Sequence, residues 1–486
     1  CDEATFLRRA FLDTIGRLPS PEEVRGHLAD RSPRRKERLV GLLLARPEFV
    51  DYWTYKWSDI LLVSGAKLRP KAVEAYSQWI RDRVAENAPW DRFVRAIVTS
   101  RGSSVENGAT NFFAVHQDPE TLAENTAQAF LSLSINCAKC HNHPLEKWTN
   151  DQYYAFANLF ARVRAKGWGG SPFAGDGVRT IIVESRGDLL QPKTGRPRPP
   201  APLDGEPLPM DDVADRREAL ARWLTAPENP YFTRAIVNRV WANFFGVGLV
   251  EPVDDLRATN PASDEKLLAA LCDFTREQGY DLKSLMRLIL LSETYARSSV
   301  PLPENKDDRR WFARAYPKRL MAEVLSDAIA DVTGVHDRYT EIVQADGSTE
   351  KVAIYDSDTR ALELRDSIVK NAFLDTFGRN AREITCECER SSQPSLVQVL
   401  HLANGTTLND KLAAQEGRIT QLLATDPQPA DVVEGAWVRV LSRPPSEAER
   451  KPFEEMLTAA TPDEKRGIVE DMYWSLMTSR EFLFRH

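Results

Sequence analysis

The sequence predicts a mainly α-helical fold, with two helical domains, a Gly/Pro-rich connecting segment and small β excursions. Apolar residues recur at helical spacing along most of the chain, as at Phe6, Ala10, Phe11 and Ile15. A length of 486 residues exceeds what one core usually organises, which favours at least two domains. Between residues 166 and 210 the composition shifts to Gly and Pro, which argues against a long helix there.

The first predicted domain covers residues 1–165 and is a series of helices. We expect Gly16 to end the first helix. The run Ser20-Pro21-Glu22-Glu23 should begin the second, because it offers an N-cap, a proline at the first helical position and acids in the first turn. Further helical patterns cover residues 36–44, 72–86, 90–99 and 120–133.

The segment 166–210 is expected to be a linker, or an insertion draped over a neighbouring surface. Its β-branched run Thr180–Val183 predicts a short strand. The second predicted domain covers residues 211–486 and is again helical, except from about residue 336 to 356. There, Ala345-Asp346-Gly347 is typical of a hairpin turn between two short strands.

Bulk properties limit the classes of partner. A net charge of -7 argues against nucleic acid, because a phosphate binder normally carries a basic stripe. Every apolar stretch is shorter than the roughly 20 residues that span a bilayer, so a transmembrane segment is not expected. The sequence opens at Cys1 without a signal segment and is helix-like by Phe6, so we expect this numbering to begin inside a longer precursor.

The motif Cys137-Ala138-Lys139-Cys140-His141 carries the clearest chemistry in the sequence. It has the C-x-x-C-H form of a c-type haem attachment site. Residues three and four apart share one face of a helical turn, so both thiols can add to the two vinyl groups of a porphyrin. The neighbouring imidazole of His141 then reaches the iron. The sequence therefore predicts covalently bound haem c.

A second cysteine pair, Cys386 and Cys388, leaves other interpretations open. With Cys137, Cys140 and a histidine such as His141, it could complete a site for zinc, another metal ion or an iron–sulfur cluster. Zinc, however, prefers two to four residues between ligands rather than one. The pair could equally form a local disulfide or remain as two ordinary thiols.

The opposite face of the iron has several candidate ligands. His401, on the helical run 394–402, is the best single candidate. His143 is a further possible metal ligand, but it lies too close to the motif to reach the opposite face without a loop reversal. His116 precedes the helix that leads into the motif, and Met321 lies on another predicted helix.

Other catalytic signatures are missing from the sequence. It has no P-loop, no G-x-G-x-x-G after a strand, no H-E-x-x-H and no G-x-S-x-G. We therefore expect a redox function and assign no catalytic residue. The favoured hypothesis is a haem-dependent oxidoreductase, because a carrier haem requires far less protein. The alternatives are a non-catalytic electron-transfer module and a non-haem metal protein.

The same motifs resemble a known family. The chain is similar to the planctomycete cytochrome-associated proteins that join DUF1549 (PSCyt2) to DUF1553 (PSD1), two domains of unknown function. The similarity to the first domain is carried by Phe6-Leu7-Arg8-Arg9-Ala10-Phe11-Leu12-Asp13, Gly16-Arg17-Leu18-Pro19 and the run from Cys137 to Trp148. The similarity to the second is carried by Asn238-Arg239-Val240-Trp241, Phe244-Phe245-Gly246, Asp254-Asp255-Leu256-Arg257 and the run from Cys386 to His401.

This resemblance implies an exported, periplasmic or otherwise extracytoplasmic protein. Family members often carry a further cytochrome-like domain, which implies a separate cytochrome domain or another electron-transfer partner. They tend to occur in genomes rich in polysaccharide degradation, which implies a glycan substrate. We expect the second domain to bring Cys386, Cys388 and His401 to the far side of the haem site.

Overall fold

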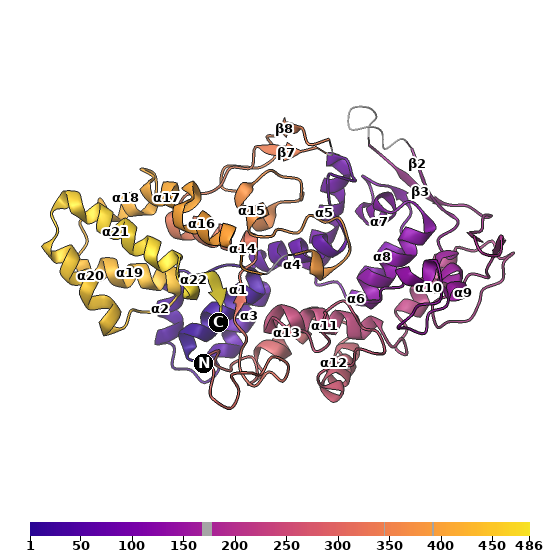
Figure 1. The fold of residues 1–486 in the computed structure, drawn as a ribbon, viewed down its shortest axis with the longest axis horizontal. Coiled ribbons are helices and arrows are strands. Elements are labelled where there is room, and N and C mark those ends of the chain that lie inside the picture. The colour runs from indigo at the N-terminus through magenta and orange to yellow at the C-terminus, as the bar shows by residue number, and fades with distance from the viewer. Residues whose placement is uncertain (168–176, 345, 391–392) are drawn as a thin grey trace.

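The structure is a computed structural model that describes residues 1–167, 177–344, 346–390 and 393–486. Helices dominate, and the strands form only small sheets (Figure 1), which confirms the predicted fold class. The molecule is elongated, with the C-terminal helices at one end and the helices around the cysteine motif towards the other. Among the described residues, none of the helices combines the length and the apolar character needed to cross a bilayer.

The helices predicted in the first 165 residues are present, with ends that differ from the predicted ranges by one or two residues, and further helices accompany them. Ser20 and Glu23 form a reciprocal capping box at the start of the second helix, and Gly16 ends the first at φ +63°, a conformation that favours glycine. The helices are α1 (Glu3–Ile15), α2 (Pro21–Ala29), α3 (Arg35–Ala45), α4 (Pro47–Ile60), α5 (Pro70–Ala85), α6 (Trp90–Val98), α7 (Asn111–Val115), α8 (Pro119–Leu131) and α9 (Asn150–Ala157).

The described part of the connecting segment is attached to the first domain. Its predicted strand is present as β3 (Thr180–Val183), which lies between β1 (Gly102–Ser103) and β2 (Val163–Lys166) in an antiparallel sheet. A second small hairpin pairs β4 (Leu190–Gln191) with β5 (Arg196–Pro197). The backbone N–H of Ala201 donates to the carbonyl of Ala155 in α9 at 3.0 Å, so the segment is draped over this helix.

The remaining residues return to helices. These are α10 (Arg216–Leu224), α11 (Phe232–Phe245), α12 (Glu265–Glu277), α13 (Leu282–Leu290), α14 (Ala322–Thr333), α15 (Ala372–Thr376), α16 (Leu396–Asn404), α17 (Thr406–Ala413), α18 (Arg418–Leu423), α19 (Pro429–Leu441), α20 (Glu447–Ala459), α21 (Pro462–Met477) and α22 (Arg480–Leu483). The predicted hairpin is β7 (Glu341–Val343) paired with β8 (Thr349–Lys351), with Gly347 at φ +80°. Ala345 lies outside the described residues.

One hydrophobic cluster runs through both predicted domains. It includes Phe130 and Leu131 of α8 as well as Val240 and Phe244 of α11, all of them buried. Helices α8 and α11 pack directly against each other. The two parts of the sequence are therefore joined by a shared core, and their contact surface is where a large cavity opens.

The two ends of the described chain meet (Figure 1). Arg8 of α1 donates to the carbonyls of Val440 and Phe482, both at 3.0 Å. The strand β9 (Phe484–Arg485) pairs with β6 (Lys318–Arg319), and Arg485 contacts Asp13 of α1 at 2.9 Å. The final residues therefore hold β6 in place, and β6 forms part of the cavity wall.

Candidate functional site

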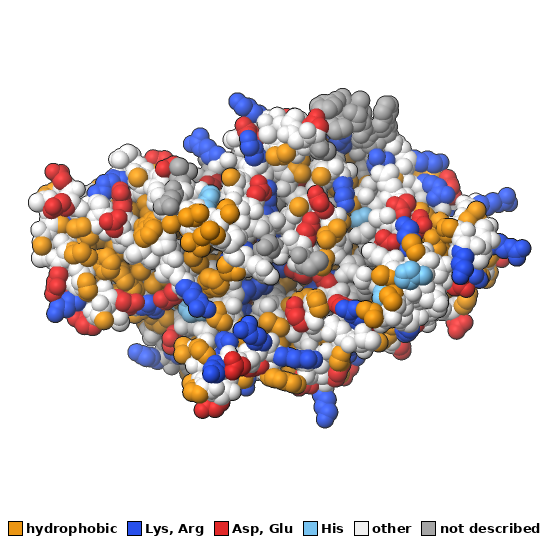
Figure 2. All heavy atoms as spheres, in the orientation of Figure 1, with side chains coloured by type: hydrophobic (Ala, Val, Ile, Leu, Met, Phe, Trp, Pro, Cys, Tyr) orange, Lys and Arg blue, Asp and Glu red, His pale blue; other side chains and the backbone are white. Residues whose placement is uncertain are grey.

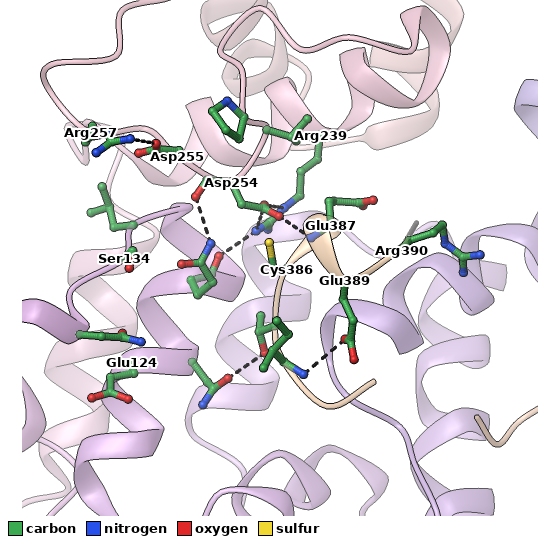
Figure 3. Close-up of a pocket in the computed structure, with 18 of the residues that line it drawn as sticks. Glu124, Ser134, Arg239, Asp254, Asp255, Arg257, Cys386, Glu387, Glu389 and Arg390 are labelled. Atoms are coloured by element: carbon green, nitrogen blue, oxygen red, sulfur yellow. Dashed lines mark hydrogen bonds and ion pairs between the residues drawn. The ribbon is translucent and has the colours of Figure 1, made fainter. Parts of the chain in front are cut away.

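A cavity of about 1190 Å³ lies where the two parts of the chain meet. Figure 2 shows acidic and basic side chains in a hollow near the middle of the molecule. The wall is built from α4, α8, the cysteine turn, α11 with the loop after it, β6, and residues 383–387, 389, 390 and 393. In Figure 3, Glu124 and Ser134 stand on one side and the segment 386–390 on the other.

The cysteine motif forms a short turn at the edge of this cavity. Helix α8 ends at Ser132 in the left-handed conformation (φ +53°), and a 3-10 helix follows over Asn136–Lys139. In such a helix, residues three apart lie on the same side, so Cys137 and Cys140 share one face. Asn150 at the start of α9 fixes the turn, because its side-chain amide donates to the carbonyls of Ala138 and Lys139, both at 2.9 Å.

The reactive groups of the motif are accessible. Cys137 and Cys140 are exposed free thiols, and His141 is exposed as well. Nδ1 of His141 lies 2.7 Å from the carbonyl oxygen of Asn142. Because a carbonyl only accepts, Nδ1 carries a proton, so in the neutral imidazole the lone pair is on Nε2. This is the tautomer that an iron-ligating histidine requires, so the three side chains fit a c-type haem.

The second cysteine segment lines the opposite side of the cavity. Cys386 is disulfide-bonded, one of the alternatives that the sequence left open. The side chain of Cys388 lies outside the described part of the structure. Glu387, Glu389 and Arg390 also line the cavity.

Glu387 is enclosed by positive charge. Both of its carboxylate oxygens lie 3.3 Å from Nζ of Lys56, and its backbone N–H donates to Asp254 at 2.6 Å. Asp254 is in turn paired with Arg239 of α11 at 2.6 Å. Burial alone would raise the pKa of Glu387, but the surrounding cations, with Lys56 first, lower it to about 2. Glu387 is therefore a carboxylate at any physiological pH.

Arg390 belongs to a second, deeper network. Its guanidinium contacts Glu323 of α14 at 2.6 Å and Asp59 of α4 at 2.7 Å. Asp59 also accepts from Arg382 at 2.9 Å. All four side chains are almost completely buried, so each depends on its partners to offset the loss of hydration. This network fixes the segment 382–390 against α4 and α14.

The histidines named from the sequence are separated in space. His143 lines the cavity, and its Nδ1 accepts from the backbone N–H of Leu145 at 3.2 Å. His116 also lines it, and burial lowers the pKa of this imidazole to about 3, which keeps it neutral. His401 is not among the described residues of the cavity wall. Its Nε2 lies 3.0 Å from the Thr407 hydroxyl.

His401 and Met321, the two candidate iron ligands that the sequence placed on helices of the second domain, are both absent from the cavity wall as the structure describes it. The ring of His401 packs edge-on against Phe373 and Phe377, which holds it in a separate apolar contact. Met321 accepts weakly from the Tyr52 hydroxyl at 3.9 Å and is not among the cavity residues that the structure describes. The described residues also contain no group of three or more His, Cys, Asp or Glu side chains placed to share one metal ion.

Lys56 and Lys318 are cavity residues that sequence reasoning missed. Neither belongs to a spaced motif, and the segments that carry them are far apart in sequence. Glu387 pairs with Lys56, and the charged groups around both lysines are brought together only by folding. The available signal was indirect, because Lys318 lies in the polar run Tyr316-Pro317-Lys318-Arg319 before α14.

Comparison with known protein families gives two matches, and each contains one of the two cysteine segments that line the cavity. Residues 1–165 match the family model PSCyt2, described as a protein of unknown function (DUF1549). Residues 216–457 match PSD1, also described as a protein of unknown function (DUF1553). Neither a curated protein nor a solved structure matches the chain.

Proposed function

The chain belongs to the family in which a PSCyt2 domain (DUF1549) precedes a PSD1 domain (DUF1553), and from this premise we propose that it is an extracytoplasmic c-type haem protein, an oxidoreductase that acts on glycans. The observation that carries the proposal is the position of the motif 137–141. It lies at the edge of a large cavity whose wall includes many charged and polar side chains, and Cys137 is part of that wall. A cofactor site beside a substrate-sized cavity favours an enzyme over a simple carrier.

The residues of the motif have defined roles in this proposal. Cys137 and Cys140 would hold the porphyrin through thioether bonds, and Nε2 of His141 would bind the iron. A bound haem supplies one-electron redox chemistry of its iron. The hydrogen bond from His141 to the Asn142 carbonyl orients the imidazole for this role.

The cavity favours a polar, hydroxylated ligand. Ser134, Asn136 and Gln393 are exposed side chains in its wall that can exchange hydrogen bonds with hydroxyl groups. Its volume of about 1190 Å³ is large enough for more than one sugar unit. These features support a glycan substrate better than an apolar one.

The surroundings of the motif support a location outside the cytoplasm and a separate redox partner. Disulfides such as that of Cys386 persist mainly in oxidising compartments. Oxidation of a glycan also requires an acceptor for the electrons that the glycan gives up. The exposure of Cys140 and His141 leaves room for a separate cytochrome domain or electron-transfer protein at the same edge.

The test is production of the whole chain in cells with an extracytoplasmic cytochrome c maturation system. We expect the protein to carry one covalent haem, detected by haem staining after denaturing electrophoresis and by intact mass. The variant Cys137→Ala/Cys140→Ala should lack it. Cys272→Ala is the matched control, since Cys272 is a buried free thiol that is not among the described residues of the cavity wall, and this variant should retain the haem.

Each other outcome identifies a rival function. Absence of haem, in cells that mature a reference cytochrome, contradicts the proposal. A stoichiometric bare metal ion found by elemental analysis would instead support the non-haem alternative, with ligands from Cys137, Cys140 and His141 and, after reduction of the Cys386 disulfide, from Cys386 and Cys388. A low-spin haem spectrum that cyanide leaves unchanged would support a pure electron-transfer module.

A further inference from the structure

Lys318 is a lysine of the cavity wall whose position is fixed on two sides. Its backbone pairs with Arg485 in the ladder between β6 and β9. Its aliphatic stem lies against Gly246, where an added Cβ would meet Cδ of Lys318 at 3.4 Å. Gly246 has φ +79°, a conformation that disfavours other residues, so the backbone at the end of α11 leaves space for this side chain.

The neighbouring carboxylates are already paired with other cations. Glu387 is bound by Lys56, Asp254 by Arg239, and Asp13 by Arg485. Within the described residues, the Lys318 ammonium has neither a carboxylate within ion-pair distance nor a hydrogen-bond acceptor. This part of the wall therefore carries one positive charge more than its own acids balance.

The acids of the outer wall are placed differently. Glu251 and Glu383 also line the cavity but are exposed to solvent, whereas Lys318 and the paired side chains around it are partly or fully buried. A ligand with many negative charges would be repelled at the outer wall. A ligand with one isolated anionic group could place it at Lys318 and keep its neutral part near the mouth.

We propose that Lys318 binds an anionic oxygen group, a carboxylate or a sulfate, on the ligand that occupies this cavity. The inference rests on the proposed function only in taking the cavity as the substrate site. An ammonium in a buried wall loses hydration, and a ligand oxyanion restores the missing counter-charge through charge-assisted hydrogen bonds. Lys56 is less suited to bind a ligand oxyanion, because its ammonium already forms an ion pair with Glu387.

Burial and the proximity of Lys56 lower the pKa of the Lys318 ammonium to about 8, which still leaves most of it protonated at neutral pH. The resulting substrate class is a glycan unit with one acidic substituent. A uronic acid supplies a carboxylate, and a sulfate ester supplies the same charge on a different centre. The structure gives their shared chemistry, and binding experiments separate them.

The test measures binding of three probes to the full chain by calorimetry. The probes are sodium glucuronate, glucose 6-sulfate and neutral glucose, each titrated into haem-loaded and haem-free protein. We expect at least one anionic probe to bind more tightly than glucose. Lys318→Gln should weaken that binding about tenfold or more, because a charged hydrogen bond is lost, and leave glucose binding unchanged.

Lys67→Gln is the matched control. Lys67 also lines the cavity, but it is exposed and its ammonium donates to the carbonyl of Glu383 at 3.0 Å. This substitution should change the affinity for the anionic probes less than about twofold, because exposed charges are screened by water and salt. The anion that binds more tightly identifies the substituent.

A labelling experiment on the unmodified protein covers the case in which Lys318→Gln fails to fold. Reductive methylation followed by peptide mass spectrometry should modify Lys318 in the free protein and be slowed there, but not at Lys67, by the preferred anion. The proposal is overturned if neither anion binds better than glucose, or if Lys318→Gln binds both anions as tightly as the original chain. Haem loading does not enter these outcomes, so this proposal and the haem proposal can fail separately.

Discussion

The two cysteine segments lie on opposite sides of one cavity and are held in opposite ways. In the turn 137–141, the side chains of Cys137, Cys140 and His141 are exposed, and the imidazole of His141 is held by a hydrogen bond to the adjacent carbonyl. The segment 386–390 is tied down by buried ion pairs through Glu387 and Arg390. Short cysteine motifs that look alike in sequence therefore differ in structural role. One is an accessible attachment point, and the other is part of the framework.

This contrast predicts a hierarchy of effects on the free energy of unfolding. Changes on the buried side should be costly because they leave charges without partners. Changes on the exposed side should leave the fold intact and alter only what the protein can bind. The following substitutions test the hierarchy in decreasing order of expected effect.

Arg390→Gln should have the largest effect. It leaves Glu323 and Asp59 without their shared cation in a buried site, so we expect a loss of about 3–5 kcal/mol in the free energy of unfolding. Urea unfolding followed by circular dichroism measures it. Arg257→Gln is the control, since the Arg257–Asp255 pair is partly exposed and should contribute at most about 1 kcal/mol. Equal losses of unfolding free energy in the two variants would contradict the idea that the buried network of Arg390 stabilises the fold more than a partly exposed ion pair of the cavity wall.

Glu387→Gln should have the next largest effect, and this effect should appear as a change in how the free energy of unfolding depends on acidic pH. The folded pKa of Glu387, about 2, lies below the ordinary value of 4.5. Its stabilising contribution is therefore complete above pH 4.5 and is lost as the pH falls through 2. We expect about 2–3 kcal/mol of acid-induced destabilisation in this window to be absent from Glu387→Gln. Unfolding free energies measured from pH 6 to pH 2 check this, and parallel curves for the two proteins would contradict it.

Lys318→Met should have a smaller effect of opposite sign. The folded pKa of Lys318, about 8, lies below its ordinary 10.5, chiefly because of burial; Lys56 and Arg485 lower it further, whereas Glu387 and Asp13 raise it. The protonated form thus costs stability below pH 8, and the cost fades as the pH rises towards 10.5. We expect Lys318→Met to be about 1 kcal/mol more stable at pH 7, with the difference shrinking at pH 9.5. A destabilised variant at pH 7 would show that the ammonium is not a cost.

His141→Ala should have the smallest effect on the fold. The imidazole is exposed, and among the described residues its hydrogen bond is to the adjacent one, so we expect a change within about 0.5 kcal/mol in haem-free protein. The same substitution should remove the histidine-ligated spectrum of the matured protein. Thermal unfolding and absorption spectroscopy on paired samples provide both readings. A large loss of stability without haem would mean that the turn belongs to the framework.

Local features of the fold were predictable from the sequence. The capping run at Ser20, the strand Thr180–Val183 and the mainly helical class depend on signals within a few residues, and the structure confirms them. The cysteine turn was also recognised, although it is a 3-10 turn rather than the end of an α-helix.

The cavity itself was only partly predictable. The sequence drew attention to Cys137 and Cys386 because cysteine pairs are conspicuous, and the structure places them on opposite sides of the same cavity. Lys56 and Lys318 carry no local signal, since their importance comes from which carboxylates fold around them. The expectation for His401 relied on its nearness in sequence to Cys386, whereas helix α16 packs this ring against Phe373 and Phe377.

The pairing of β6 with β9 has a consequence for biosynthesis. Arg485 and Asp13 are 472 residues apart, so their contact cannot form until the chain has been made through Arg485. The cysteine turn lies much earlier in the chain, so in an export that starts from the N-terminus it reaches the outside before Arg485. An extracytoplasmic maturation enzyme would therefore meet Cys137 and Cys140 while the cavity is still unassembled, and the order of export itself would keep the attachment point open.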